Sequence, residues 1–194
     1  IGYGVFQNCK ELNKVSIAVD YDTNENKAWF SGSPVQEIYY TKGKTGIMPD
    51  TKNSTGYDNS YNKRLEYMMR KTLKKVSFEE GITRIGACAY GGWGGTDIYS
   101  VHTDLIEINL PDTLLSIGNC AFHGQNSLEN IVLPRNVSEI GVRAFGSCRA
   151  LKRAELPESI ETIGTNAFEF CSSFTSTEDV KLPSKMDYIP EGMY

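Results

Sequence analysis

Apolar residues recur along the chain at one fixed spacing, most regularly in its C-terminal half. The pairs Leu-Pro, Ile-Gly and Ala-Phe each appear three times there, in steps of 23 residues. They stand at Leu110-Pro111, Leu133-Pro134 and Leu156-Pro157; at Ile117-Gly118, Ile140-Gly141 and Ile163-Gly164; and at Ala121-Phe122, Ala144-Phe145 and Ala167-Phe168. A period of this length predicts stacked supersecondary units, each of which buries its apolar side against its neighbours.

A single repeat shows how each unit folds. The pattern Leu-x-x-Ile-x-Leu-Pro puts Ile131 and Leu133 on one face of an extended segment, and Asn130 and Val132 on the other. Pro134 ends the strand because it lacks a backbone donor. The Ile-Gly step suits a tight bend or close packing of coils, and the Ala-Phe segment is compact enough for a turn of helix. The expected fold is a β-rich solenoid with one parallel strand per coil and short helical or irregular returns.

Six segments fit the strand pattern. They are Leu12-Val15-Ile17, Leu73-Val76-Phe78, Leu105-Ile108-Leu110, Leu128-Ile131-Leu133, Leu151-Ala154-Leu156 and Phe174-Val180-Leu182. Their first residues are 61, 32, 23, 23 and 23 residues apart, so the first two steps exceed one period by 38 and 9 residues. The prediction is one solenoid domain over residues 1–194, with an insertion at about 18–64 and a shorter one at about 90–103.

Both ends of the chain fall inside a repeat. Ile1-Gly2 is in register with Ile140-Gly141, and Ile189-Pro190 is in register with Ile163-Gly164. Because an open coil edge exposes apolar side chains that natural arrays cover with caps, we expect this chain to be part of a longer array.

The long insertion is polar and rich in turn residues. Its start favours a hairpin in which Val15–Tyr21 pairs with Lys27–Phe30. Asp20-x-Asp22-x-Asn24 has the spacing of the first ligands of a calcium loop. Glu25 stands where such a loop needs Gly, so a polar turn is the favoured interpretation.

Composition narrows the classes of partner. The 194 residues carry a net charge of −4, and no basic run is present that could follow a phosphate backbone. Nucleic acid and anionic membrane surfaces are therefore not expected as partners. No apolar run approaches the roughly 18 residues that span a bilayer, so no membrane insertion is expected of this segment. The oligomeric state is not predicted.

The repeat resembles the BspA-like leucine-rich repeat, also called the Treponema pallidum type. The resemblance is carried by Leu-x-x-Ile-x-Leu-Pro, then Ile-Gly-x-x-Ala-Phe and a Cys three residues later, over nearly all of the chain outside the long insertion. It implies a curved solenoid with a parallel sheet on its concave side. It also implies a secreted or cell-surface protein of bacteria or some protozoa, in a family often described as adhesins. Glu79 departs from the family pattern, because Pro is expected there.

The cysteines follow the repeat. Cys9, Cys148 and Cys171 stand three residues after the aromatic, whereas Cys88 and Cys120 directly precede an Ala. Positions fixed by a repeat are usually core, which favours buried thiols. Stacked coils bring equivalent positions to about 5 Å, so two disulfides remain open as alternatives: Cys148 with Cys171, or Cys88 with Cys120.

No pattern indicates a catalytic site, a metal site or a cofactor. The sequence has no Cys-x-x-Cys or His-rich zinc spacing. His123 stands in a repeat position that favours a solvated loop residue. His102 lies near Asp97 and Asp104, but no Ser or Cys nucleophile stands in a recognisable elbow.

The concave face is the surface that a leucine-rich repeat usually offers to partners. Its expected outward residues are Lys14, Ser16, Lys75, Ser77, Glu107, Asn109, Asn130, Val132, Arg153, Glu155, Asp179 and Lys181. They are mixed in charge and include no aromatic, whereas binding hot spots favour Trp, Tyr and Arg. A solvated sheet is therefore favoured over a tight binding surface.

Aromatic residues of the insertions are better anchors by residue type. Tyr90 occupies the Ala-Phe position and is expected in the core, and Trp93 stands between two glycine pairs. The candidate binding residues are Trp93, Tyr99, Trp29, Asn130, Val132, Arg153 and Glu155, with Trp93 first. The leading hypothesis is a non-catalytic, adhesin-like module of an extracellular or cell-surface protein that binds a protein or a glycan. The alternative is a spacer or assembly segment without a ligand; an enzyme is the third class.

Overall fold

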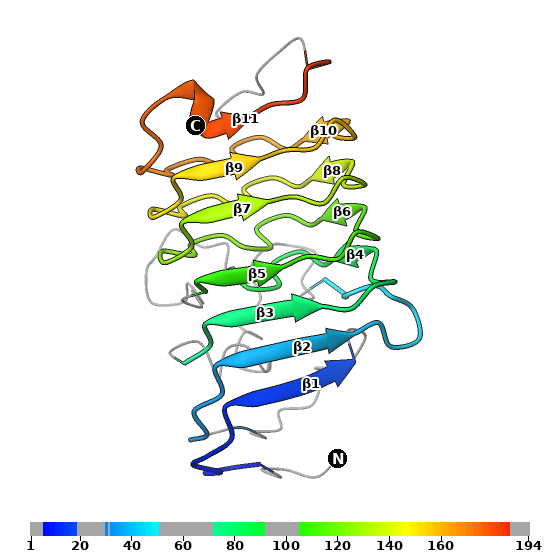
Figure 1. Ribbon diagram of the computed structural model, residues 1–194, viewed down its shortest axis with the longest axis vertical. Helices are drawn as coiled ribbons and strands as arrows, with labels where there is room; N and C mark the ends of the chain where they lie inside the picture. The colour runs from blue at the N-terminus through cyan, green and yellow to red at the C-terminus, as the bar shows by residue number, and fades with distance from the viewer. Residues whose placement is uncertain (1–5, 19–29, 31, 51–71, 92–104, 187–194) are drawn as a thin grey trace.

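The chain winds into a stack of coils with strands on two sides (Figure 1). The structure, a computed structural model, describes residues 6–18, 30, 32–50, 72–91 and 105–186. The long strands are β1 (Lys14–Ala18), β2 (Glu37–Thr41), β3 (Lys75–Phe78), β5 (Glu107–Asn109), β7 (Asn130–Val132), β9 (Arg153–Glu155) and β11 (Val180–Lys181). The short strands are β4 (Arg84–Ile85), β6 (Ser116–Ile117), β8 (Glu139–Ile140) and β10 (Thr162–Ile163).

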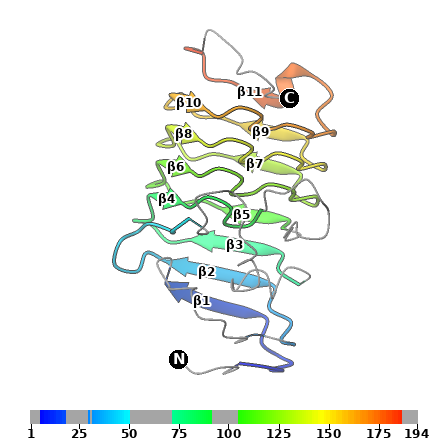
Figure 2. The ribbon, with the colours of Figure 1, turned by 180° about the vertical axis from the view of Figure 1, so that it is seen from behind.

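Every strand pairs in parallel with the strand of a neighbouring coil. The long strands form two sheets, in the orders β1-β2-β3-β5 and β7-β9-β11, and the short strands form one, β4-β6-β8-β10. Figures 1 and 2 show the long and the short strands as two separate columns along the stack. The prediction of a β-rich repeat solenoid with parallel strands is confirmed.

Strand β2 lies within the segment that the sequence predicted as one long insertion. Lys14 of β1 pairs with Glu37 of β2, which is one 23-residue period further on, and Glu37 pairs in turn with Lys75 of β3. The prediction that all of 18–64 is an insertion is therefore wrong. Val35 and Tyr40 fill the two Leu positions of this coil, and no Pro follows the strand, so the pattern was hidden.

The predicted hairpin is wrong at Phe30, the one residue of its second arm that the structure describes. Strand β1 pairs in parallel with β2, and Phe30 lies in a turn. Residues 27–29, the rest of the second hairpin arm, lie outside the described residues. The same holds for the calcium-like sequence from Asp20 to Asn24.

The C-terminal core contains a stack of aromatic rings from the Ala-Phe position. Tyr90, Phe122, Phe145 and Phe168 are almost fully buried. Their consecutive ring centroids lie 5.4, 5.5 and 5.4 Å apart, with interplanar angles of 1°, 15° and 7°. Each such pair contributes about 0.5–1.5 kcal/mol beyond the burial of its surface. The prediction that Tyr90 belongs to the core is confirmed.

The N-terminal core takes rings from the strands as well as from outside them, where Phe6 stacks on Phe30 with ring centroids 5.2 Å apart. Tyr40 of β2 stacks on Phe78 of β3 with ring centroids 5.2 Å apart. Both rings meet the edge of Tyr90 at 6.4 Å, with interplanar angles of 78° and 80°. Tyr90 thus joins the two sets of rings.

The glycine of each Ile-Gly step lets neighbouring coils approach. A Cβ on Gly118 would lie 2.5 Å from the backbone nitrogen of Ala87, and one on Gly141 would lie 2.5 Å from that of Asn119. Real Cβ atoms do not come so close to backbone atoms. The structure therefore requires glycine here for close packing of coils, one of the two roles expected from the sequence.

The returns between strands are turns, and the helical turn expected at residues 143–148 is absent from this described segment. Arg143 and Ser147 have φ values of 53° and 57°, in the left-handed region, and each interrupts a right-handed helix. The same two positions of other coils are left-handed as well, at Cys88, Cys120 and Asn166 and at Asn8, Gly124 and Phe170. In the described residues the one helical segment is the 3-10 turn η2 (Thr177–Asp179).

Candidate functional site

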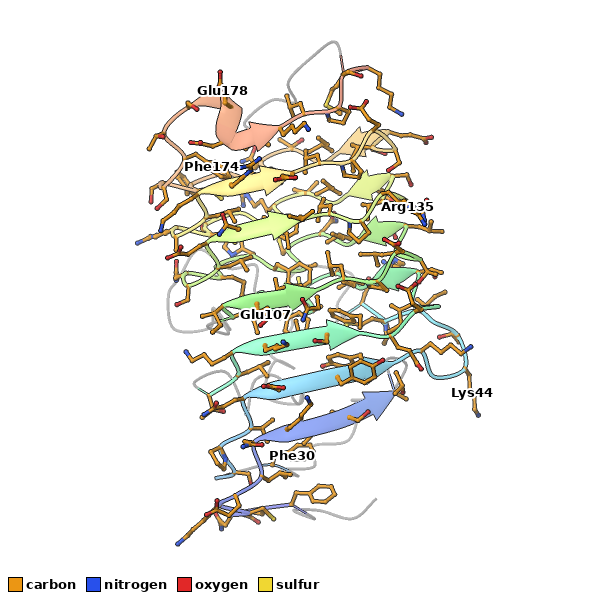
Figure 3. The ribbon with its side chains drawn as sticks, in the orientation of Figure 1. Phe30, Lys44, Glu107, Arg135, Phe174 and Glu178 are labelled. Atoms are coloured by element: carbon orange, nitrogen blue, oxygen red, sulfur yellow. The ribbon has the colours of Figure 1, made fainter. Side chains whose placement is uncertain are left out.

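The outward side chains of the long strands form the surface considered first, called here the long-strand face. Its side chains alternate with buried ones along β2 and β3 and with half-buried ones along β1, as a pleated strand requires. The first row is Lys14, Glu37, Lys75 and Glu107, continued at equivalent repeat positions by Asn130 and Arg153. The second row is Ser16, Tyr39, Ser77 and Asn109, continued by Val132, Glu155 and Lys181. Figure 3 labels Glu107 of the first row, on β5.

Ion pairs join most of the charges on this face. They are Lys14–Glu37 at 3.1 Å, Lys75–Glu107 at 2.6 Å and Arg153–Glu155 at 2.9 Å. The hydrogen bond between Lys75 and Glu107 raises the pKa of the lysine and lowers the pKa of the carboxyl group. Both groups are therefore ionised at neutral pH, and their charges oppose each other.

The face exposes two larger side chains that are not charged. Tyr39 in β2 is 38% exposed and Val132 in β7 is 63% exposed. The expectation of a face without aromatic residues is wrong, because it was derived without β2. Tyr39 is thus a candidate binding residue that the sequence analysis missed; the signal was the 23-residue step from Ser16.

The structure brings together four of the candidate binding residues. Asn130 pairs with Arg153 and Val132 with Glu155, on the adjacent strands β7 and β9. The aromatic candidates are Trp93, Tyr99 and Trp29, and all three lie outside the described residues. The four strand candidates therefore lie side by side on one surface. The binding role of the three aromatic candidates stays a prediction.

The cysteines occupy two ladders along the coils. The thiol of Cys148 donates a hydrogen bond to the carbonyl oxygen of Phe122, and that of Cys171 to Phe145, both at 3.2 Å. Burial and a hydrogen bond with Cys171 raise the pKa of Cys148. Cys120 contacts the Cys88 side chain, and this hydrogen bond, followed by burial, raises the pKa of Cys120. Cys120 and Cys148 therefore lack the lowered pKa of a nucleophile.

Cys9 departs from the expectation of buried cysteines, because it is exposed. It occupies the repeat position of Cys148 and Cys171, which are buried. Its backbone N–H is bound to the hydroxyl of Ser33 at 2.9 Å.

Gln125 replaces cysteine at the same repeat position and is fully buried. Its side-chain oxygen accepts a hydrogen bond from the backbone of Leu105 at 3.2 Å, and its amide nitrogen donates to the carbonyl of Tyr90 at 2.8 Å. A buried polar side chain is tolerated when both ends are bonded in this way. Gln125 therefore connects the residues on either side of segment 92–104, and we assign it a structural role.

Side chains that could bind a metal ion are dispersed over the described part of the chain. There, His, Cys, Asp and Glu form no cluster of three or more that could hold a metal ion. His123 is half-buried, so the expectation of a solvated loop residue needs correction, and His102 lies outside the described residues. The described residues also include no helix long and apolar enough to cross a membrane.

Solved structures of similar fold come from bacterial leucine-rich repeat proteins. The T. pallidum leucine-rich repeat protein is 29% identical, with a TM-score of 0.51, over 89% of this chain and 59% of its own. A leucine-rich repeat protein from Bacteroides ovatus is 22% identical, with a TM-score of 0.52, over 92% of this chain and 56% of its own. The chain thus spans less than two thirds of the length of both proteins.

A leucine-rich cell surface protein from Faecalibacterium prausnitzii is 18% identical, with a TM-score of 0.40, over 100% of this chain and 61% of its own. A search of curated protein sequences gave no match. The model of the BspA type leucine-rich repeat region matches six copies in residues 1–54 and 95–194, which is more than half of the chain. This chain is therefore a member of the BspA-type leucine-rich repeat family.

Proposed function

We propose that this chain is a non-catalytic binding module of an extracellular or cell-surface protein, and that it presents its long-strand face to a protein or glycan ligand. The observation that carries the proposal is the exposure of Tyr39 and Val132 on the long-strand face, whose neighbouring charges are largely paired. Tyrosine is among the residues that contribute most to binding energy at interfaces. Family membership supports the proposal, because leucine-rich repeats generally mediate protein interactions.

The packing beneath the face makes it rigid. Ile38 and Tyr40 point inward from the strand that carries Tyr39 and are buried. Ile131 does the same beneath Val132. Side chains on such a support lose little conformational freedom when a ligand binds, so more of the contact energy appears as affinity.

The second candidate is a spacer that sets reach without a ligand of its own. The paired charges favour it, since Lys14–Glu37 and Lys75–Glu107 satisfy each other without a partner. An enzyme is set aside because the family consists of repeats that are generally non-catalytic, and the sequence contains no recognisable nucleophile elbow.

A binding screen separates the two candidates. The chain would be tested against arrays of extracellular-matrix proteins and glycans, together with the double variant Tyr39→Ala/Val132→Ser and the single variant Trp93→Ala. The matched control is Leu115→Ser, because Leu115 is 49% exposed and directly precedes the short strand β6, away from the long strands. A saturable hit that the double variant weakens at least tenfold, and the control does not, supports the module. If the chain binds nothing on either array, the spacer function is favoured.

A further inference from the structure

We propose that the N-terminal half of the long-strand face binds a neutral oligosaccharide, with Tyr39 as the surface on which a sugar ring packs. This inference rests on the binding function proposed above and specifies its ligand class and its site. The site is the row Ser16, Tyr39, Ser77 and Asn109, on β1, β2, β3 and β5, called here the Tyr39 row.

The neighbouring strands place only small side chains directly beside Tyr39, which is 38% exposed. Ser16 lies opposite Tyr39 on β1 and Ser77 lies opposite it on β3, each at the strand spacing of about 4.8 Å. Serine is too short to cover an aromatic ring. Within the described part of the chain, no hydrogen bond or ring contact occupies the Tyr39 side chain. The flat ring is therefore accessible to the C–H face of a pyranose, which packs on aromatic surfaces.

The polar side chains of the row match the hydroxyl groups of a sugar. The Asn109 amide nitrogen donates hydrogen bonds to the Ser77 hydroxyl at 3.2 Å and to the Glu107 carboxylate at 2.8 Å. These bonds use both amide hydrogens and leave the Asn109 oxygen as an acceptor and the Ser77 hydroxyl hydrogen as a donor. A sugar hydroxyl both donates and accepts, so it can use the two together.

The charges beside the Tyr39 row favour a ligand without charge. The four first-row residues of the same strands are two lysines and two carboxylates, joined as Lys14–Glu37 and Lys75–Glu107. A charged glycan or peptide would have to break one of these pairs or leave its own charge unmatched. A neutral ligand leaves both pairs intact.

The size and polarity of the row favour an oligosaccharide over a protein. The four strands extend over about 14 Å, which suits a short chain of sugars. A stable protein interface buries about 1,000 Å² or more around an apolar centre. The Tyr39 row contains one aromatic and no aliphatic side chain, so it lacks such a centre.

The test is a glycan array followed by titration calorimetry on the full chain. The array would carry oligomers of glucose, mannose and N-acetylglucosamine beside sialylated and sulfated glycans. The strongest neutral hit would be titrated in 50 mM and 500 mM NaCl. We expect affinities within twofold of each other at the two salt concentrations, because a neutral ligand releases no counterions.

Variants locate the site. Tyr39→Ala is expected to weaken binding at least tenfold, and Tyr39→Phe, which keeps the ring, less than threefold. Tyr39→Ser is a second variant without the ring, in case Tyr39→Ala unfolds, and it should weaken binding to the same extent. Serine is chosen because Ser16 and Ser77 already occupy the positions beside Tyr39. Leu115→Ser is again the control, because Leu115 directly precedes the short strand β6, away from the long strands, and it should change the affinity less than twofold.

Four results would overturn the proposal. Neutral-glycan binding that survives Tyr39→Ala would place the site elsewhere, and binding confined to acidic glycans that salt abolishes would exclude a neutral ligand. A silent glycan array together with a protein ligand lost in Tyr39→Ala would refute the glycan inference while the proposed binding function stands. Silence of both screens would refute both.

Discussion

The two halves of the core reach the same packing from different positions of the repeat. In the C-terminal half the rings come from the returns, as at Phe122 and Phe145, and the strands contribute leucines such as Leu133. In the N-terminal half Phe6 and Phe30 also stack outside the strands, but Tyr40 and Phe78 are added from the strands themselves. The difference shows that the core fixes the volume within each coil more strictly than the identity of the residue at each position.

Tyr90 is the test of this comparison, because its ring contacts both sets of aromatics. We expect Tyr90→Ala to destabilise the chain by about 3–5 kcal/mol, as for other buried rings cut to alanine. Hydrogen exchange should accelerate on both sides of the substitution, at β3 and at β7. Phe168→Ala is the comparison, and its effect should stay near β9 and β11. Unchanged exchange at β3 in Tyr90→Ala would show that the N-terminal core does not depend on this ring.

The coil-to-coil contact at glycine is common to both halves. Gly141 meets the backbone of Asn119, and Gly86 meets the backbone of Pro49. Each substitution by alanine is expected to cost about 1–3 kcal/mol in denaturant unfolding, as overpacking does. The control is Thr165→Ala, at an exposed site. If Gly86→Ala were tolerated, the N-terminal coils would be more loosely stacked than their C-terminal counterparts.

A substitution at Phe170 is expected to raise the free energy of unfolding, by less than the substitutions above lower it. It has a φ of 59° and is 67% exposed, whereas the equivalent position of an N-terminal coil is Asn8, with a φ of 56°. A left-handed conformation costs about 1–2 kcal/mol for most residues and little for asparagine. We therefore expect Phe170→Asn to raise stability by about 1 kcal/mol. Ser147→Asn, at the same left-handed repeat position, should show a similar gain without the loss of a ring. A destabilised Phe170→Asn would show that the exposed ring makes contacts that outweigh the strain.

Acid should loosen the last coil first. Hydrogen bonds from the backbone of Thr175 and Ser176 hold the pKa of Asp179 below its ordinary value of 3.8, and those from Ser184 hold the pKa of Glu158 below 4.5. A lowered pKa in the folded state stabilises the fold above the unfolded value, and this stabilisation is lost as the pH falls through the folded value.

Proteolysis of the chain between pH 5 and pH 2.5 measures this effect. We expect cleavage near η2 and β11 to increase below about pH 4 before cleavage near β7 does. In Asp179→Asn, part of this pH dependence should disappear. Equal cleavage of both regions at every pH would contradict the assignment of these carboxylates as local stabilisers.

The sequence predicted the parallel solenoid because its period is carried by glycine, proline and apolar residues that one packing geometry requires. It missed β2, since Val35 and Tyr40 satisfy the same volume without leucine, and with β2 it missed Tyr39. It also predicted a helical turn where Arg143 and Ser147 are left-handed. Arginine and serine have no marked preference for the left-handed conformation, so the repeat pattern could not predict it at these two residues.

The glycine contact between coils bears on how such a chain changes in evolution. Gly118, Gly141 and Gly164 each receive the backbone of the preceding coil in the same way, so any one coil can follow any other. The gain or loss of 23 codons therefore adds or removes one whole coil and alters the reach of the protein by about 4.8 Å. Slippage during DNA replication can thus change the length of the protein by one folded coil at a time.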